Sequence, residues 1–156
     1  MLAEFSLTIF YTQVTVCVSG APLPALAWAD EHVAQGFAWS PSAVSFGVPD
    51  HDAECLMQVE VAPGVSIEPQ ALWVIRVPFD VPGPSLKIGS VFAEHEVKVP
   101  AGKYSLVFEV LPGNTIEDRD YTYVFKLKFS ADPHPDFEIL KQGGELTTDK
   151  VLRRDA

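Results

Sequence analysis

Alternation of apolar and polar residues, interrupted by prolines and glycines, is the feature of this sequence that most restricts its fold. The longest example spans residues 4–18, where Phe5 and Leu7 have one parity and Val14 has the other. A period of two is typical of a strand with one buried face. The change of parity near residues 12–13 predicts a bulge or a strand that switches faces.

Similar runs follow along most of the chain, and turn sequences such as Pro63–Gly64 and Pro112–Asn114 separate them. The runs are rich in β-branched and aromatic residues, which strands favour. Further strands are predicted at residues 42–48, 54–61, 71–77, 86–92, 94–99, 103–111 and 121–130. About eight short strands at this spacing predict an all-β fold, a two-layer antiparallel β-sandwich. One short helix is predicted near residues 26–36, with Gly36 suited to its C-terminal cap.

The length of 156 residues fits one domain with its own core. Residues 1–131 are predicted to form a single β-sandwich domain. Residues 132–156 are predicted to be a polar C-terminal extension, with one edge strand at Phe137–Leu140 followed by a mobile tail. The alternating N-terminal segment lacks the basic start of a signal peptide, and no apolar run approaches the ~20 residues that span a bilayer. These features predict a soluble, cytoplasmic protein.

The charges are unevenly distributed, with 21 acidic and 11 basic residues and a formal net charge of −10. No Lys or Arg precedes Arg76, whereas eight carboxylates do. A surface so short of cations cannot neutralise phosphates, which disfavours direct binding to nucleic acid or to an anionic membrane. The same surface would attract a basic protein. The alternative, that the acidity only aids solubility, explains the composition equally well.

The sequence contains few catalytic or metal-binding patterns. Cys17 and Cys55 lie in apolar runs and are predicted to be buried thiols. Asp50–Asp52, with His51 at its centre, is the single metal-like cluster, and it is more typical of a solvated turn. Glu94–Glu96, a pair of carboxylates flanking His95, could serve as general acid and base, but an exposed strand face explains them better. Of the three tryptophans, Trp28, Trp39 and Trp73, the first and last are predicted in the core and Trp39 is not assigned.

Residues 116–123 form a more informative segment. Glu117, Asp118 and Asp120 precede Tyr121, and carboxylates beside tyrosines suit the recognition of a basic protein surface. A solvated turn followed by strand tyrosines is the alternative interpretation.

Several segments carry a resemblance to a known family. They include residues 9–16, 24–48, Val77–Phe79 and Val99–Tyr104, together with the Pro112 loop leading to Tyr121. In order and spacing the chain resembles the competence protein J (ComJ) family over roughly residues 7–129. The resemblance implies a non-enzymatic inhibitor that binds a metal-dependent DNA nuclease. It implies no catalytic residue of its own, and the extension after Ala131 departs from the shorter members.

The resulting hypothesis is a nuclease inhibitor, of a DNA-uptake nuclease or of a toxin nuclease, whose acidic surface covers the basic nuclease cleft. The expected contact residues are Asp30, Glu31, Glu117, Asp118, Asp120 and Tyr121, with no cofactor and no metal. Asp30 and Glu31 would alternatively stabilise the N-terminus of their own helix. Two other hypotheses are a β-sandwich module that binds a carbohydrate or calcium, and a hydrolase that uses Glu94–Glu96.

Overall fold

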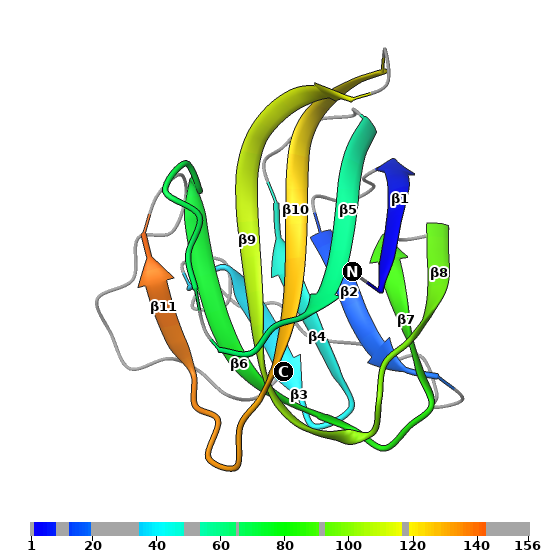
Figure 1. Ribbon diagram of the computed structural model, residues 1–156, viewed down its shortest axis with the longest axis vertical. Helices are drawn as coiled ribbons and strands as arrows, with labels where there is room; N and C mark the ends of the chain where they lie inside the picture. Colours follow the sequence, from blue (N-terminus) through cyan, green and yellow to red (C-terminus); the bar gives the residue numbers. More distant parts are fainter. Residues whose placement is uncertain are drawn as a thin grey trace.

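The structure, a computed structural model, describes residues 2–8, 13–19, 35–48, 54–64, 66–90, 93–116 and 119–142. Their strands form two sheets that pack face to face, and this arrangement confirms the predicted all-β sandwich (Figure 1). The six-stranded sheet has the order β1-β5-β10-β9-β6-β11. Its strands are β1 (Ala3–Thr8), β5 (Glu54–Val61), β6 (Trp73–Val81), β9 (Gly102–Ile116), β10 (Arg119–Ala131) and β11 (Glu138–Lys141).

The second sheet has five strands in the order β3-β4-β2-β7-β8. They are β2 (Gln13–Val18), β3 (Phe37–Ser40), β4 (Ala43–Gly47), β7 (Ser85–Ser90) and β8 (Ala93–Lys98). Of the predicted helix, residues 26–34 lie outside the described residues. Gln35 is helical, and Gly36 has a φ of 84°, the left-handed conformation expected at a C-terminal cap.

The change of parity in residues 4–18 separates two strands that belong to different sheets. Leu7 of β1 and Val14 and Val16 of β2 are all buried, so each strand directs its own parity toward the shared core. Residues 9–12, which join the two strands, lie outside the described part of the chain. The change of parity therefore corresponds to the passage of the chain from one sheet to the other.

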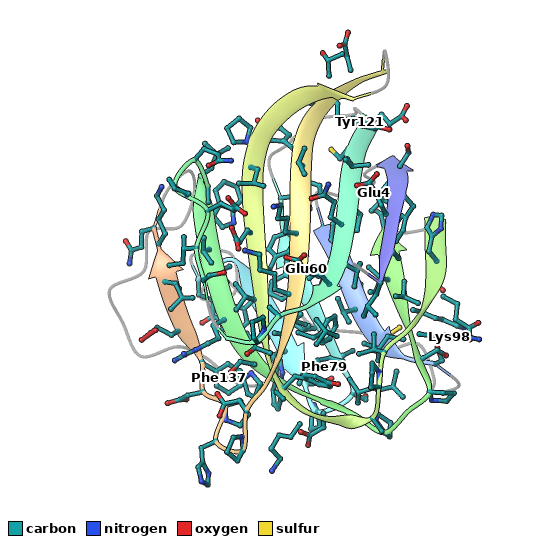
Figure 2. The ribbon with its side chains drawn as sticks, viewed as in Figure 1. Glu4, Glu60, Phe79, Lys98, Tyr121 and Phe137 are labelled. Atoms are coloured by element: carbon teal, nitrogen blue, oxygen red, sulfur yellow. The ribbon has the colours of Figure 1, made fainter. Side chains whose placement is uncertain are left out.

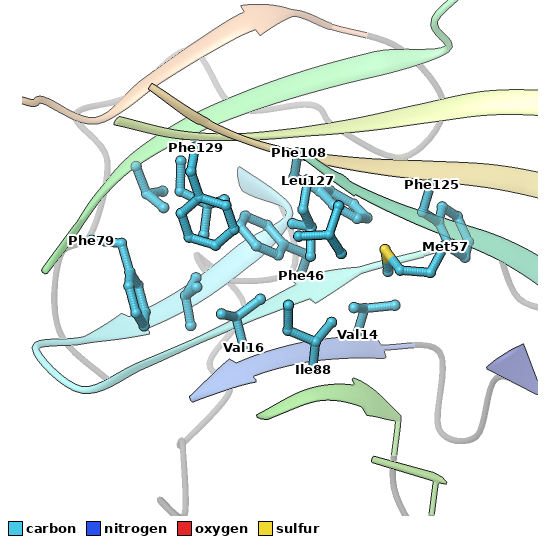
Figure 3. Close-up of a cluster of buried hydrophobic side chains, with 14 of the residues drawn as sticks. Val14, Val16, Phe46, Met57, Phe79, Ile88, Phe108, Phe125, Leu127 and Phe129 are labelled. Carbon is cyan, nitrogen blue, oxygen red and sulfur yellow. The ribbon is translucent and has the colours of Figure 1, made fainter. Parts of the chain in front are cut away.

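The inner faces of the two sheets form the main core. Phe46 of the five-stranded sheet stacks on Phe108 of the six-stranded sheet, with ring centroids 4.4 Å apart. Figure 3 shows Met57, Phe125 and Leu127 directed into the same space. All five side chains are fully buried. Aromatic side chains from both layers thus fill the space between the sheets.

One pair of strands departs from the predicted antiparallel pattern. β5 pairs with β10 in parallel, and the other described strand pairs are antiparallel. Two strands, β10 and β9, therefore stand between β5 and β6. The chain connects β5 to β6 through residues 62–72, described except for residue 65, and these cross the outer face of the six-stranded sheet. We call residues 62–72 the crossover segment.

The Pro112–Asn114 sequence, predicted as a turn, lies within β9 instead. Pro112 stands opposite Tyr123 of β10, whereas the pairing of β9 with β6 ends at Val110. Beyond Val110 that side of β9 has no partner strand among the described residues. A proline, which lacks a backbone N–H, is accommodated in a strand at such an edge position.

Candidate functional site

The β9–β10 hairpin reaches beyond the neighbouring strands at one end of the six-stranded sheet (Figure 1). β5 runs parallel to β10, with Leu56 opposite Val124, so both strands begin at this end. Two carboxylates mark the end in the described residues: Asp120 is exposed and Glu54 is half-buried. We call it the hairpin end.

Asp120 has a defined position at the hairpin end. Its Oδ1 accepts a hydrogen bond of 2.6 Å from the Thr115 hydroxyl of β9. The residue is exposed to solvent. The side chains of the other four carboxylates predicted as contacts, Asp30, Glu31, Glu117 and Asp118, lie outside the described residues.

Tyr121, the sixth predicted contact, is largely buried, with 9% of its surface exposed. Its hydroxyl lies 3.0 Å from Ser6 Oγ of β1. Its ring packs in a second apolar cluster that also contains Leu56, Leu111 and Val124. Tyr121 therefore links edge strand β1 to the hairpin, and Figure 2 labels it near the hairpin end of the sheet.

The outer face of the six-stranded sheet carries a buried ion pair that the sequence analysis did not identify. Lys128 Nζ lies 2.5 Å from Glu109 Oε1, and Glu109 is fully buried. Glu109 Oε2 accepts a hydrogen bond of 3.1 Å from the backbone N–H of Glu68 in the crossover segment. The sequence alone could not reveal the pairing of Glu109 with Lys128. It follows from the register of β9 and β10, in which Glu109 stands opposite Lys126.

The crossover segment adds a second, more accessible pair. Lys126 Nζ donates to Glu68 Oε1 at 3.0 Å, and the Glu68 side chain is 31% exposed. This hydrogen bond and the positive charge of Lys126 lower the pKa of the Glu68 carboxyl. Lys128 Nζ also donates to the Ser66 carbonyl oxygen at 3.4 Å. Cations of β10 thus hold the crossover segment against the sheet.

Further carboxylates line edge strand β1 and its neighbour β5. Glu4 is exposed and accepts a hydrogen bond of 2.8 Å from Gln58, while Glu60 is half-buried on the same face of β5 (Figure 2). The alternation of β5 would have indicated that Gln58 and Glu60 share a face. The neighbouring strand could not be inferred from the sequence, because β1 and β5 are far apart in the chain.

The hydrolase alternative placed Glu94, His95 and Glu96 in a concave site. All three are exposed on β8, the edge strand of the five-stranded sheet. The His95 ring stacks on Phe5 at 4.0 Å, and Glu96 Oε1 accepts a hydrogen bond of 2.8 Å from Ser85. An exposed edge strand is not the concave site that this alternative requires.

The small-ligand alternative required exposed tryptophans or a carboxylate cage. Trp73 is buried, as predicted, and Trp39 is half-buried with its Nε1 donating to the Pro78 carbonyl oxygen at 2.8 Å. Trp28 and residues 50–52 lie outside the described residues. Across the described ranges, no three His, Cys, Asp or Glu side chains are grouped so that they could hold a metal ion.

The two cysteines are buried free thiols, as predicted. Burial raises the pKa of Cys55 to about 11 and also raises the pKa of Cys17. Because the thiolate is the reactive form, both side chains act as small apolar residues at neutral pH. Within the described part of the chain, no helix is long and apolar enough to cross a membrane.

The fold and these surfaces define an acidic β-sandwich protein, with described carboxylates at the hairpin end, on edge strands, beside the crossover segment and at the opposite end of the six-stranded sheet. The chain belongs to the competence protein J (ComJ) family, because the family's model matches residues 6–130.

Among solved structures, the chain is similar to a crystal structure of ComJ from Bacillus subtilis, described as the inhibitor of the DNA-degrading activity of NucA. The two share 23% sequence identity and a TM-score of 0.64, and the match covers 81% of this chain and 95% of that chain. At this identity the likeness shows a common fold. The comparison with curated proteins found no match.

Proposed function

We propose that this chain is a protein inhibitor of a DNA nuclease and that it acts by covering the basic cleft of the nuclease. Membership of the ComJ family carries the proposal, since the Bacillus subtilis relative is an inhibitor of the DNA-degrading activity of NucA. The formal net charge of −10 supports it. A cleft that binds DNA is positively charged, so an acidic protein is drawn to it and associates rapidly.

The contact surface in this proposal is the hairpin end. Asp120 is exposed there, and Glu117 and Asp118 stand next to it in the sequence. Their carboxylates take the place of DNA phosphates against the cations of the cleft. Asp30 and Glu31 are proposed as a second set of acidic contacts. Tyr121, whose hydroxyl contacts Ser6, is proposed to support the hairpin end from below.

The chain itself is proposed to have no catalytic role and no cofactor, and to act in the cytoplasm. Inhibition then depends on the lifetime of the complex, which desolvated contacts at the centre of an interface determine more than charges at its rim. The family supports a nuclease of the DNA-uptake machinery as the partner; a secreted toxin nuclease is the alternative partner.

A DNA-cleavage assay with purified NucA-type nuclease and increasing amounts of this protein tests the proposal. We expect stoichiometric loss of cleavage and binding that weakens as salt is added. Undiminished cleavage of DNA in the presence of a saturating excess of folded protein would contradict inhibition of that nuclease. The same assay with a toxin nuclease distinguishes the two possible partners.

Charge reversal tests the contact surface separately. Asp120→Lys is expected to weaken binding to the nuclease by about tenfold or more, chiefly through slower association. Asp80→Lys is the matched control, because Asp80 is also exposed but lies where β6 pairs with the start of β9, at the opposite end of the sheet. Equal effects of the two substitutions would exclude the hairpin end as the contact surface.

A further inference from the structure

The family match ends at residue 130, and the described part of the chain continues to residue 142. This last part lies at one edge of the six-stranded sheet. Residues 138–141 form β11, which pairs antiparallel with β6. β11 is short and its register shifts between Ile139 and Lys141. Figure 1 shows β11 at the margin of the six-stranded sheet, next to β6. We call residues 136–141 the docking segment.

An aromatic side chain anchors the docking segment to the other sheet. The Phe137 ring stacks on Phe37 with centroids 6.0 Å apart and meets the edge of Trp39 at 5.0 Å. Phe37 and Trp39 belong to β3, an edge strand of the five-stranded sheet. The docking segment therefore spans the open edges of both sheets at once.

Polar contacts at the surface complete the attachment. Arg76 of β6 lies 3.5 Å from Glu138, and Lys141 Nζ donates to the Pro69 carbonyl oxygen at 3.2 Å. The Glu138 side chain is 53% exposed, and Phe137 and Ile139 are only half-buried. Such contacts are individually weak and accessible to solvent, so a segment held by them can leave and return.

The site that receives the segment is built from strands of both sheets. β6 presents the hydrogen-bonding groups of Val74–Arg76 to a partner strand, and Trp39 donates to Pro78 one step further along the same edge. An unpaired strand edge is a template for another extended chain. The β6 edge, Phe37 and Trp39 thus form an acceptor for an extended segment with an aromatic residue followed by an acidic one.

We propose that this acceptor is a strand-exchange site, which the docking segment fills within one chain and which the docking segment of a second copy can fill in its place. The contacts are the same in either case, since the two copies have the same sequence. Residues 132–135, with prolines at positions 133 and 135, form the connection that would have to rearrange. A short connection keeps the intramolecular form dominant until the protein concentration approaches about 1 mM.

Complementary charge reversal tests the exchange with full-length chains. In Arg76→Glu the acceptor repels its own Glu138, and in Glu138→Arg the segment repels its own Arg76. When the two variants are mixed, exchange restores opposite charges at both sites of a heterodimer. We expect native mass spectrometry and analytical ultracentrifugation to show about tenfold more dimer in the mixture than in either variant alone.

The double variant Arg76→Glu with Glu138→Arg, in one chain, is the matched control. It restores the pair within the molecule, so it is expected to remain as monomeric as the unaltered protein. Adding Phe137→Ala to the Glu138→Arg chain should remove the aromatic anchor from one of the two exchanged segments and reduce heterodimer formation. Folded variants that stay monomeric when mixed would overturn the proposal, as would a heterodimer unaffected by Phe137→Ala.

Discussion

The two faces of the six-stranded sheet are built from the same strands but are stabilised differently. On the inner face, aromatic and aliphatic side chains of both sheets pack into one continuous core. On the outer face, a smaller apolar cluster lies beside the Glu109–Lys128 pair, beneath the crossover segment. Burial on the inner face therefore depends on side-chain shape, whereas burial on the outer face also requires that charges be paired.

The largest effect is expected on the inner face. Phe108→Ala should lower the free energy of unfolding by about 3–5 kcal/mol, because it removes a fully buried ring that stacks on Phe46 and packs near Phe125. Urea denaturation measures the loss. Leu72→Ala, at a residue that is 37% exposed, is the control, with an expected loss below about 1 kcal/mol. Comparable losses of stability in Phe108→Ala and Leu72→Ala would contradict the special contribution of the inner face.

On the outer face, leaving a buried charge without its partner should lower the free energy of unfolding by about 3 kcal/mol. Lys128→Met achieves this by leaving the fully buried Glu109 without its cation. Equilibrium unfolding of Lys128→Met and of the double variant Lys128→Met with Glu109→Leu separates pairing from packing. The double variant should recover part of the loss, though it forfeits the hydrogen bond from the Glu68 N–H. A double variant less stable than the single would contradict this account.

Gly113→Ala should lower the free energy of unfolding by about 1–3 kcal/mol, because it crowds the backbone of the hairpin. A methyl group at Gly113 would meet the backbone oxygens of Tyr121 and Thr122 on β10, which cannot withdraw without disrupting the hairpin. Gly64→Ala is the matched control, because nothing lies within 4 Å of the added methyl group. Thermal unfolding of the two variants should differ, and equal melting temperatures would indicate that the hairpin adjusts freely.

The smallest effect on stability concerns the half-buried pair between Glu68 and Lys126. Folding lowers the pKa of Glu68, so its contribution is present above the unfolded pKa of about 4.3 and is lost as the pH falls through the lower folded pKa. Glu68→Gln should therefore reduce stability by about 0.5–1 kcal/mol at neutral pH and much less in acid. Urea unfolding at several pH values measures this. Glu94→Gln, at an exposed position on β8, is the matched control.

Most strands could be predicted from the sequence because a half-buried strand alternates along its length. Two features escaped for physical reasons. β3 is short, and Phe37 and Ala38 are both buried, so it carries no period of two. The Pro112–Gly113 pair has the composition of a turn, but its pairing with Tyr121–Tyr123 keeps it in β9. Pairing with a partner strand outweighed the local preference.

The candidate site was predicted less completely than the fold. The acidic segment before Tyr121 was visible in the composition, and Asp120 is exposed at the hairpin end. Nothing along the chain indicated that Tyr121 would be buried against β1, because Ser6 is 115 positions away. The common face of Glu4 and Glu60 could not be predicted either, since it depends on which strands are neighbours.

The sequence by itself determined the alternating strands, the burial of both cysteines and the excess of carboxylates, since each is a property of local pattern or composition. Only the tertiary structure decided which charges became partners. Glu109 and Lys128 are buried together because β9 and β10 bring them to one face beneath the crossover segment. A charge is tolerated in a protein interior only beside its counter-charge, and that distance is fixed by the register and order of strands, which a linear pattern does not encode.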